Sequence, residues 1–145
     1  MDKYFRAAKN AAKKSDVETI KVGACLVNKG IFIGYNTKKT HPLLPEVYRS
    51  TLSQHAEFRA ILNAKKKADG GILYVYRESK TGDIKKARPC DDCLGFAISR
   101  GIIQIYYTIN NKIYGEINCS ISEYEYYYDV QPSVFNTRQI FPSEN

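Results

Sequence analysis

The sequence lacks the features that would place the chain in or across a membrane. None of its 145 residues belongs to an apolar run of the roughly 18 or more residues that a membrane-spanning helix needs. The N-terminal stretch MDKYFRAAKNAAKK also lacks the apolar core of a secretory signal peptide. We therefore expect a cytoplasmic protein without a membrane partner.

Residues that bind transition metals are few, with two histidines and four cysteines. Cys25 lies inside the apolar run VGACLV, which is typical of a small buried hydrophobic residue. Cys119 has no evident partner in the sequence. Cys90 and Cys93 form a Cys-x-x-Cys pair, which in an intracellular chain indicates metal or redox chemistry rather than a structural disulfide.

The sequence also has no internal repeat and no linker that would separate two domains. A hydrophobic content of 43% in 145 residues is typical of one compact domain. The net charge of +7 favours an anionic partner such as a nucleotide or a nucleic acid. The basic residues are dispersed rather than gathered into an arginine-rich arm, however. The same charge is therefore also compatible with ordinary solvated lysine pairs.

Apolar periodicity predicts alternating helices and strands. We expect helices over 2–14, from Ser53 or His55 to about Lys67, and from Pro89 to about Arg100, a hairpin over 22–36, and strands over 72–77 and 102–109. Such alternation predicts an α/β sandwich with parallel strand pairs after the hairpin. The proline-containing segment 40–53 is predicted to be a loop. Near the C-terminus, Tyr124, Tyr126 and Tyr128 alternate with other residues, which predicts an added strand or an interface.

Two predicted helix starts carry metal-binding side chains. His55 and Glu57 precede the apolar residues of one helix, and Cys90 and Cys93 flank the start of the next. Two thiolates and one imidazole are a tetrahedral Zn²⁺ ligand set with the fourth position left for water, as in catalytic zinc sites. Glu57 is not a ligand in such a site, so we expect it to act as a general acid/base.

Two other interpretations of these residues stay open. A Cys-x-x-Cys pair also occurs in thioredoxin-like redox proteins, although there it usually follows the first strand. A structural zinc site would need a fourth protein ligand, and the remaining histidine is His41 in the predicted loop.

His-x-Glu at one helix start and Pro-Cys-x-x-Cys at the next are together the signature of zinc nucleobase deaminases. The chain resembles the cytidine and deoxycytidylate deaminase superfamily through VGACLV, GYN, HAE, PCDDC and IYYT, in that order and over roughly residues 1–110. The resemblance implies a three-layer α/β/α fold whose mixed central sheet begins with the N-terminal β-hairpin. It places a deaminase domain at 1–120 and a Tyr-rich extension at 121–145, within the same domain or at its interface.

The resemblance also implies roles for individual residues. Asn36 would hold a sugar hydroxyl, the backbone of Ala56 would contact the base carbonyl, and Tyr107 would stack on the base or reach a phosphate. Arg88 departs from the family pattern, in which a small or acidic residue often precedes Pro-Cys. An arginine there would grip a phosphate or a nucleic-acid backbone, or would pair with Glu78 or Asp83. The family often forms oligomers, so we expect a homo-oligomer.

Three functions follow from these observations. The leading hypothesis is deamination of a free cytosine nucleotide, deoxycytidylate-like, with one zinc ion per chain and the loop Thr37–Leu52 closing one side of the site. The alternative is a deaminase acting on cytosine or adenine in single-stranded DNA or RNA. The third is nucleotide binding without turnover, which the intact set of His55, Glu57, Cys90 and Cys93 argues against.

Overall fold

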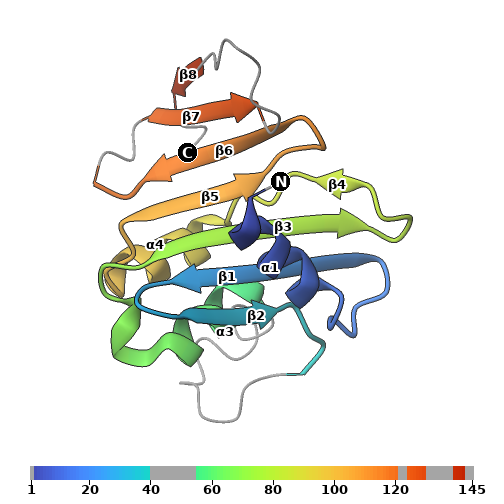
Figure 1. The fold of residues 1–145 in the computed structure, drawn as a ribbon, viewed down its shortest axis with the longest axis horizontal. Coiled ribbons are helices and arrows are strands. Elements are labelled where there is room, and N and C mark those ends of the chain that lie inside the picture. Colours follow the sequence, from blue (N-terminus) through green and yellow to red (C-terminus); the bar gives the residue numbers. More distant parts are fainter. Residues whose placement is uncertain (1, 40–54, 121–123, 130–138, 143–145) are drawn as a thin grey trace.

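The computed structural model describes residues 2–39, 55–120, 124–129 and 139–142. Its strands form one eight-stranded sheet in the order β2-β1-β3-β5-β6-β7-β8, with β4 paired to β3 (Figure 1). The strands are β1 (Ile20–Val27), β2 (Ile31–Tyr35), β3 (Ile72–Ser79), β4 (Ile84–Lys85), β5 (Gln104–Thr108), β6 (Ile113–Asn118), β7 (Tyr124–Asp129) and β8 (Gln139–Pro142).

The sheet is mixed, as predicted, but antiparallel pairs dominate it. Among the described strands only β3 and β5 run parallel, because the helix between them returns the chain to the same end of the sheet. Strands β5 and β6 are antiparallel because a tight turn joins them, in which the Asn110 side chain accepts the backbone N–H groups of Lys112 and Ile113. The predicted parallel pairing after the hairpin is therefore confirmed for one pair.

Helices cover both faces of the sheet, which confirms the three-layer architecture. Helix α1 (Lys3–Ala12) packs on one face, while α3 (Ala56–Ala64) and α4 (Asp91–Ser99) lie on the other, with a 3₁₀ turn (Lys65–Ala68) after α3 (Figure 1). Among the described residues no helix is both long and apolar enough to cross a bilayer.

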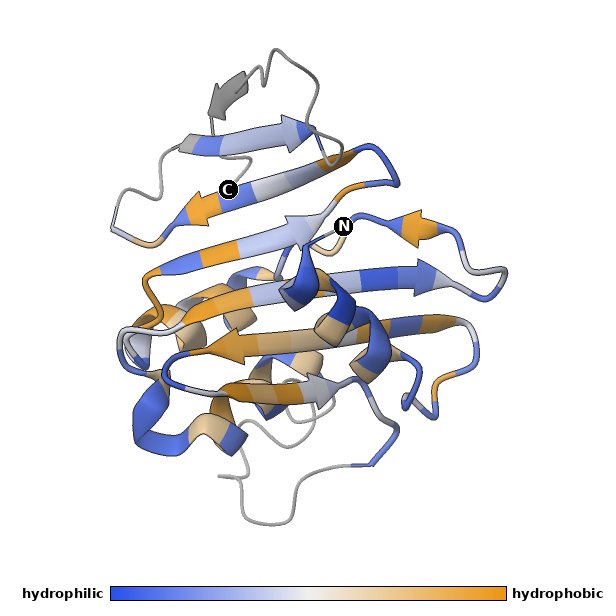
Figure 2. Ribbon diagram, viewed as in Figure 1, coloured by the Kyte–Doolittle hydropathy of each residue, from blue (hydrophilic) through white to orange (hydrophobic). Residues whose placement is uncertain are grey.

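Side chains of β3 alternate between the two helical layers. Leu73 and Val75 belong to the core under α3 and α4, whereas Tyr74 and Tyr76 pack in the core under α1. The same alternation places Arg77 on the α3/α4 face. Figure 2 shows apolar residues along β1 and the edge strand β2.

Helix α1 approaches the sheet closely at Gly23 of β1. A Cβ atom built at Gly23 would lie 1.9 Å from the Ala8 carbonyl oxygen and 2.5 Å from the Ala12 nitrogen. Both contacts are with helix backbone, which cannot move aside without displacing α1.

We therefore expect Gly23→Ala to destabilise the protein by about 1–3 kcal/mol or more, the usual cost of overpacking a core. Gly95 is the matched control, because it is exposed in the middle of α4 and a Cβ atom there meets nothing within 4 Å. Gly95→Ala should stabilise by about 0.5–1 kcal/mol through helix propensity. Urea denaturation measures both effects, and an unchanged midpoint for Gly23→Ala would contradict this account of the α1 contact.

The sequence predicted the three helices, the hairpin and strands β3, β5 and β7. It did not predict β6, which pairs with β5 on one side and with β7 on the other and so joins β7 to the sheet. The predicted loop over 40–53 lies outside the described residues.

Candidate active site

The predicted metal ligands lie at the N-termini of α3 and α4. His55 is the N-cap residue of α3, with an extended backbone and no capping hydrogen bond from its side chain. Cys90 is the N-cap residue of α4, and its sulfur accepts the backbone N–H of Cys93 at 3.4 Å. Stacked rings of Phe58 and Phe96, with centroids 4.1 Å apart, hold the two helices together. Helix packing therefore fixes the distance between the imidazole and the two thiols.

The three side chains fit a zinc ion. Their ligand atoms all lie within 4.8 Å of one another. His55 Nδ1 is 3.1 Å from Cys93 Sγ and 3.9 Å from Cys90 Sγ. Ligands around one tetrahedral zinc ion, at bonds of about 2.0–2.3 Å, lie roughly 3.5–4 Å apart. One imidazole and two thiolates are therefore close to the required spacing.

Glu57 lies beside this set, in the first turn of α3, and is 6% exposed. Burial raises the pKa of its carboxyl group, while its own backbone N–H, His55 and the Cys93 thiol oppose that shift. Burial also raises the pKa of the Cys93 thiol, so metal binding there must displace a proton.

A cavity of about 340 Å³ opens at this site. Residues from β1, β3, α3, the segment after β2 and the approach to α4 line it: Val17, Ile20, Val22, Asn36, Thr37, His55, Ala56, Glu57, Arg77, Ala87, Arg88 and Cys90. Six of the eight site residues predicted from the sequence therefore line the cavity. A seventh, Cys93, lies next to it, in contact with His55.

Asn36 is fixed by the strand beside it. Its side-chain oxygen accepts the N–H of Val22 at 2.8 Å, and its amide nitrogen donates to the carbonyl of Ile20 at 2.9 Å. These two bonds orient the amide at the cavity wall, where it is held between β1 and the end of β2.

Arg88 also lines the cavity, but its partner differs from the two predicted. Its Nε donates to Glu125 Oε1 at 2.5 Å rather than to Glu78 or Asp83. Glu78 instead accepts the hydroxyl of Tyr76. Sequence proximity favoured the wrong carboxylates, because Glu125 reaches Arg88 only through the folding of β6 and β7 onto the sheet.

Tyr107 does not line the described cavity. It is fully buried on β5, and its hydroxyl donates to Glu125. Its place near the end of a strand suggested a substrate contact, but the side chain packs in the core between the sheet and α3/α4.

Arg77 is a cavity residue that the sequence analysis missed. Its Nη1 donates weakly to the carbonyl of Lys86 at 3.5 Å, and its Nε is buried with no hydrogen-bond partner among the described residues. The alternation of apolar side chains along β3 could have placed Arg77 on the same face as the metal ligands.

The fold and the site together define a class of protein. A three-layer sandwich that presents a zinc ligand set from two helix N-termini, beside a buried glutamate, is a zinc-dependent deaminase.

Comparison with known proteins identifies the family. The profile of the cytidine and deoxycytidylate deaminase zinc-binding region matches residues 1–109, and the chain belongs to this family. Zinc is accordingly its cofactor, and cytosine-type deamination is its reaction. No curated protein matches the chain.

Solved structures share the fold. The apo dCMP deaminase from the cyanophage S-TIM5 is 23% identical, with a TM-score of 0.53 over 74% of this chain and 80% of that one. Cytidine deaminase from Burkholderia pseudomallei is 24% identical, with a TM-score of 0.53 over 72% of this chain and 80% of that one. At these identities the likeness concerns the architecture.

Proposed function

We propose that the protein deaminates a free cytosine nucleotide, deoxycytidylate-like, to the uracil nucleotide with release of ammonia. The observation that supports a phosphorylated substrate is Arg77, a cation in the cavity wall whose buried Nε has no hydrogen-bond partner among the residues that the structure describes. Leaving such a donor unsatisfied costs about 1–3 kcal/mol. A phosphate in the cavity would match the charge of this guanidinium.

The size of the cavity supports a small substrate. Ligand cavities span about 300–1,000 Å³, and 340 Å³ is at the lower end of this range. A polynucleotide would instead need several phosphate contacts along an open groove. Arg77 supplies one such contact, and Arg88 is already paired with Glu125.

The zinc ligands in this proposal are His55, Cys90 and Cys93. When bound, the ion acts as a Lewis acid and lowers the pKa of water to about 7. Asn36 holds a sugar hydroxyl, and the Ala56 backbone contacts the base carbonyl.

Glu57 moves the protons of the reaction. It accepts a proton from the attacking water and delivers it to the ring nitrogen beside the amino carbon. The water oxygen bonds to that carbon. Proton transfer to the amino group then allows the carbon–nitrogen bond to break, so that ammonia leaves and a carbonyl remains. The raised pKa of Glu57 suits a group that must both take and return a proton near neutral pH.

Arg77→Gln tests the phosphate contact. The KM for deoxycytidylate should rise by about 10–100-fold, the value of one charge-assisted hydrogen bond, while turnover of deoxycytidine stays nearly unchanged. Arg100→Gln is the matched control, because Arg100 caps the opposite end of α4 and stacks on Phe96. Equal losses on nucleotide and nucleoside would contradict the assignment of Arg77 to a phosphate.

Salt dependence separates this proposal from the alternative of a single-stranded DNA or RNA substrate. Polynucleotide affinity falls with salt roughly in proportion to the number of phosphates contacted. For a mononucleotide we expect a shallow slope and better turnover than for a cytosine-containing oligonucleotide. Preferred turnover of the oligonucleotide, with a steep loss between low and moderate salt, would favour the alternative.

A further inference from the structure

Glu125 is a buried carboxylate in β7, beyond the residues 1–109 that match the family. It is 1% exposed and lies 37 residues along the chain from Arg88. Its Oε1 accepts from Arg88 Nε at 2.5 Å, and its Oε2 accepts the hydroxyls of Tyr107 and, at 3.4 Å, Tyr127. A carboxylate this deeply buried is stable only with such partners.

Arg88 connects this cluster to the cavity. Its side chain is 13% exposed, and it lines the cavity wall two residues before Cys90. Its Nη1 lies 3.3 Å from the carbonyl of Pro89 and 4.0 Å from the Asp91 carboxylate. Because a guanidinium is planar and rigid, a bond to Nε fixes the orientation of the whole group.

The segment that leads into α4 is thus held through its backbone and through a side chain. Its backbone is tied to β5, where the Ala87 N–H donates to the carbonyl of Thr108 at 2.8 Å. Its side-chain tie is the Arg88–Glu125 pair. The first tie lies within the residues that match the family, and the second depends on β7.

We propose that Glu125 is a positioning residue for the deaminase site, and that β7 forms part of the substrate-binding apparatus by holding Arg88 against the cavity wall. Arg88 shapes the wall that the substrate contacts, and Glu125 orients it there. The Tyr107 hydroxyl supports this arrangement by donating to Glu125, since burial raises the pKa of Tyr107 and keeps it protonated.

This role predicts an effect on substrate binding rather than on the chemical step. The described contacts of Glu125 reach Arg88 and two tyrosines, and none of them is to Glu57 or to a zinc ligand. Loss of the pair should therefore raise KM with little change in kcat.

The test is Glu125→Gln, which removes the charge and keeps the shape. With the cytosine substrate that the wild type turns over fastest, KM should rise by about tenfold or more, because Arg88 is no longer held against the cavity wall. The kcat should stay within about threefold and the zinc content should be unchanged. Because the substrate is chosen by activity, this inference does not depend on the phosphate assigned to Arg77.

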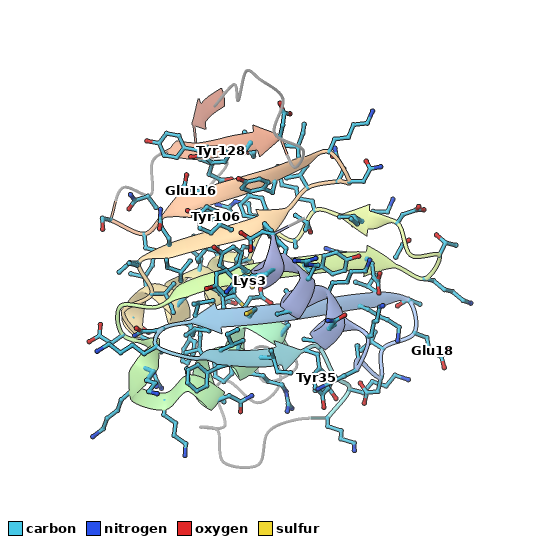
Figure 3. The ribbon with its side chains drawn as sticks, in the orientation of Figure 1. Lys3, Glu18, Tyr35, Tyr106, Glu116 and Tyr128 are labelled. Atoms are coloured by element: carbon cyan, nitrogen blue, oxygen red, sulfur yellow. The ribbon has the colours of Figure 1, made fainter. Side chains whose placement is uncertain are left out.

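Glu116→Gln is the matched control. Glu116 is also a buried carboxylate of the same sheet, 6% exposed, and it accepts from Tyr128 at 2.6 Å and Gln104 at 2.6 Å. It lies on the α1 face beside Tyr106 and Tyr128 (Figure 3), and it does not line the cavity. Its KM should stay within about twofold of the wild type. Equal KM changes in the two variants would show that loss of any buried carboxylate has this effect, and would overturn the proposal.

A double-mutant cycle shows whether Glu125 acts through Arg88. Arg88→Gln should raise KM about as much as Glu125→Gln, and the double variant should be no worse than the more affected single variant. Multiplicative effects would overturn the proposal, as would an unchanged KM in folded, zinc-loaded Glu125→Gln. If Glu125→Gln does not fold, Glu125→Asp replaces it in the cycle, because it keeps the charge but withdraws the carboxylate from Arg88.

Discussion

Glu57→Gln is expected to lower turnover by at least about 100-fold, the low end of the contribution of general acid/base catalysis. Glutamine has nearly the same shape but cannot exchange a proton at its side-chain oxygen. Because Glu57 is proposed as the proton carrier and not as a metal ligand, the variant should keep its fold and its zinc. The measurements are kcat by ammonia release, zinc content and thermal unfolding, on the same preparation.

Glu18→Gln is the control for the chemical change itself. Glu18 is exposed, as Figure 3 shows at the edge of the molecule, and it does not line the cavity. Its substitution should leave turnover unaffected. Activity close to that of the wild type in zinc-loaded Glu57→Gln would contradict the proton-carrier role, whereas loss of zinc from that variant would assign Glu57 to the metal.

Cys93→Ala is expected to remove zinc and activity together. Cys93 is 1% exposed and lies 3.1 Å from His55 Nδ1, so no solvent-exposed group can easily replace its sulfur. Loss of a partner that merely orients a ligand costs about 10–100-fold in metal affinity, and loss of a ligand should cost more than that. The measurement is zinc per chain after dialysis, where the wild type should retain one ion.

Cys119→Ala controls for the removal of a thiol. Cys119 is half-buried just beyond the end of β6, and it is not part of the metal-binding group. Zinc content should be the same as in the wild type. Undiminished zinc in Cys93→Ala would remove the basis for the site.

The zinc site could be predicted from the sequence because each half of it is local. His55 and Glu57 are two residues apart, Cys90 and Cys93 are three apart, and both pairs stand at helix starts that the sequence marks clearly. Once the helices were placed, two thiols and one imidazole favoured zinc, and the resemblance to the deaminases supported that choice over a redox pair. The family match over residues 1–109 confirms that cofactor.

The partner of Arg88 could not be predicted in this way. Glu125 reaches it only because β6 leads the chain back along β5, and β6 has weak strand signals. Gly115 lies in its middle, where a Cβ atom would be 2.3 Å from the Tyr107 ring, so close packing requires a residue that otherwise disfavours strands. Because β6 was not predicted, the pairing of Arg88 with Glu125 could not be predicted either.

Other expectations stay predictions. The homo-oligomer, the cytoplasmic location and the domain boundary at residue 120 are not tested by the described structure. The closing of the cavity by the segment 37–52 concerns residues that lie mostly outside the described ranges.

Product analysis tests the central claim most directly. Zinc-loaded protein is incubated with deoxycytidylate, deoxycytidine and a cytosine-containing single strand in parallel, and ammonia is measured together with the mass of the product. The account predicts one ammonia for each deoxycytidylate converted to deoxyuridylate, with deoxycytidine and the single strand converted more slowly. Absence of ammonia and of any uracil product from all three substrates, in protein that holds one zinc ion per chain, would contradict it.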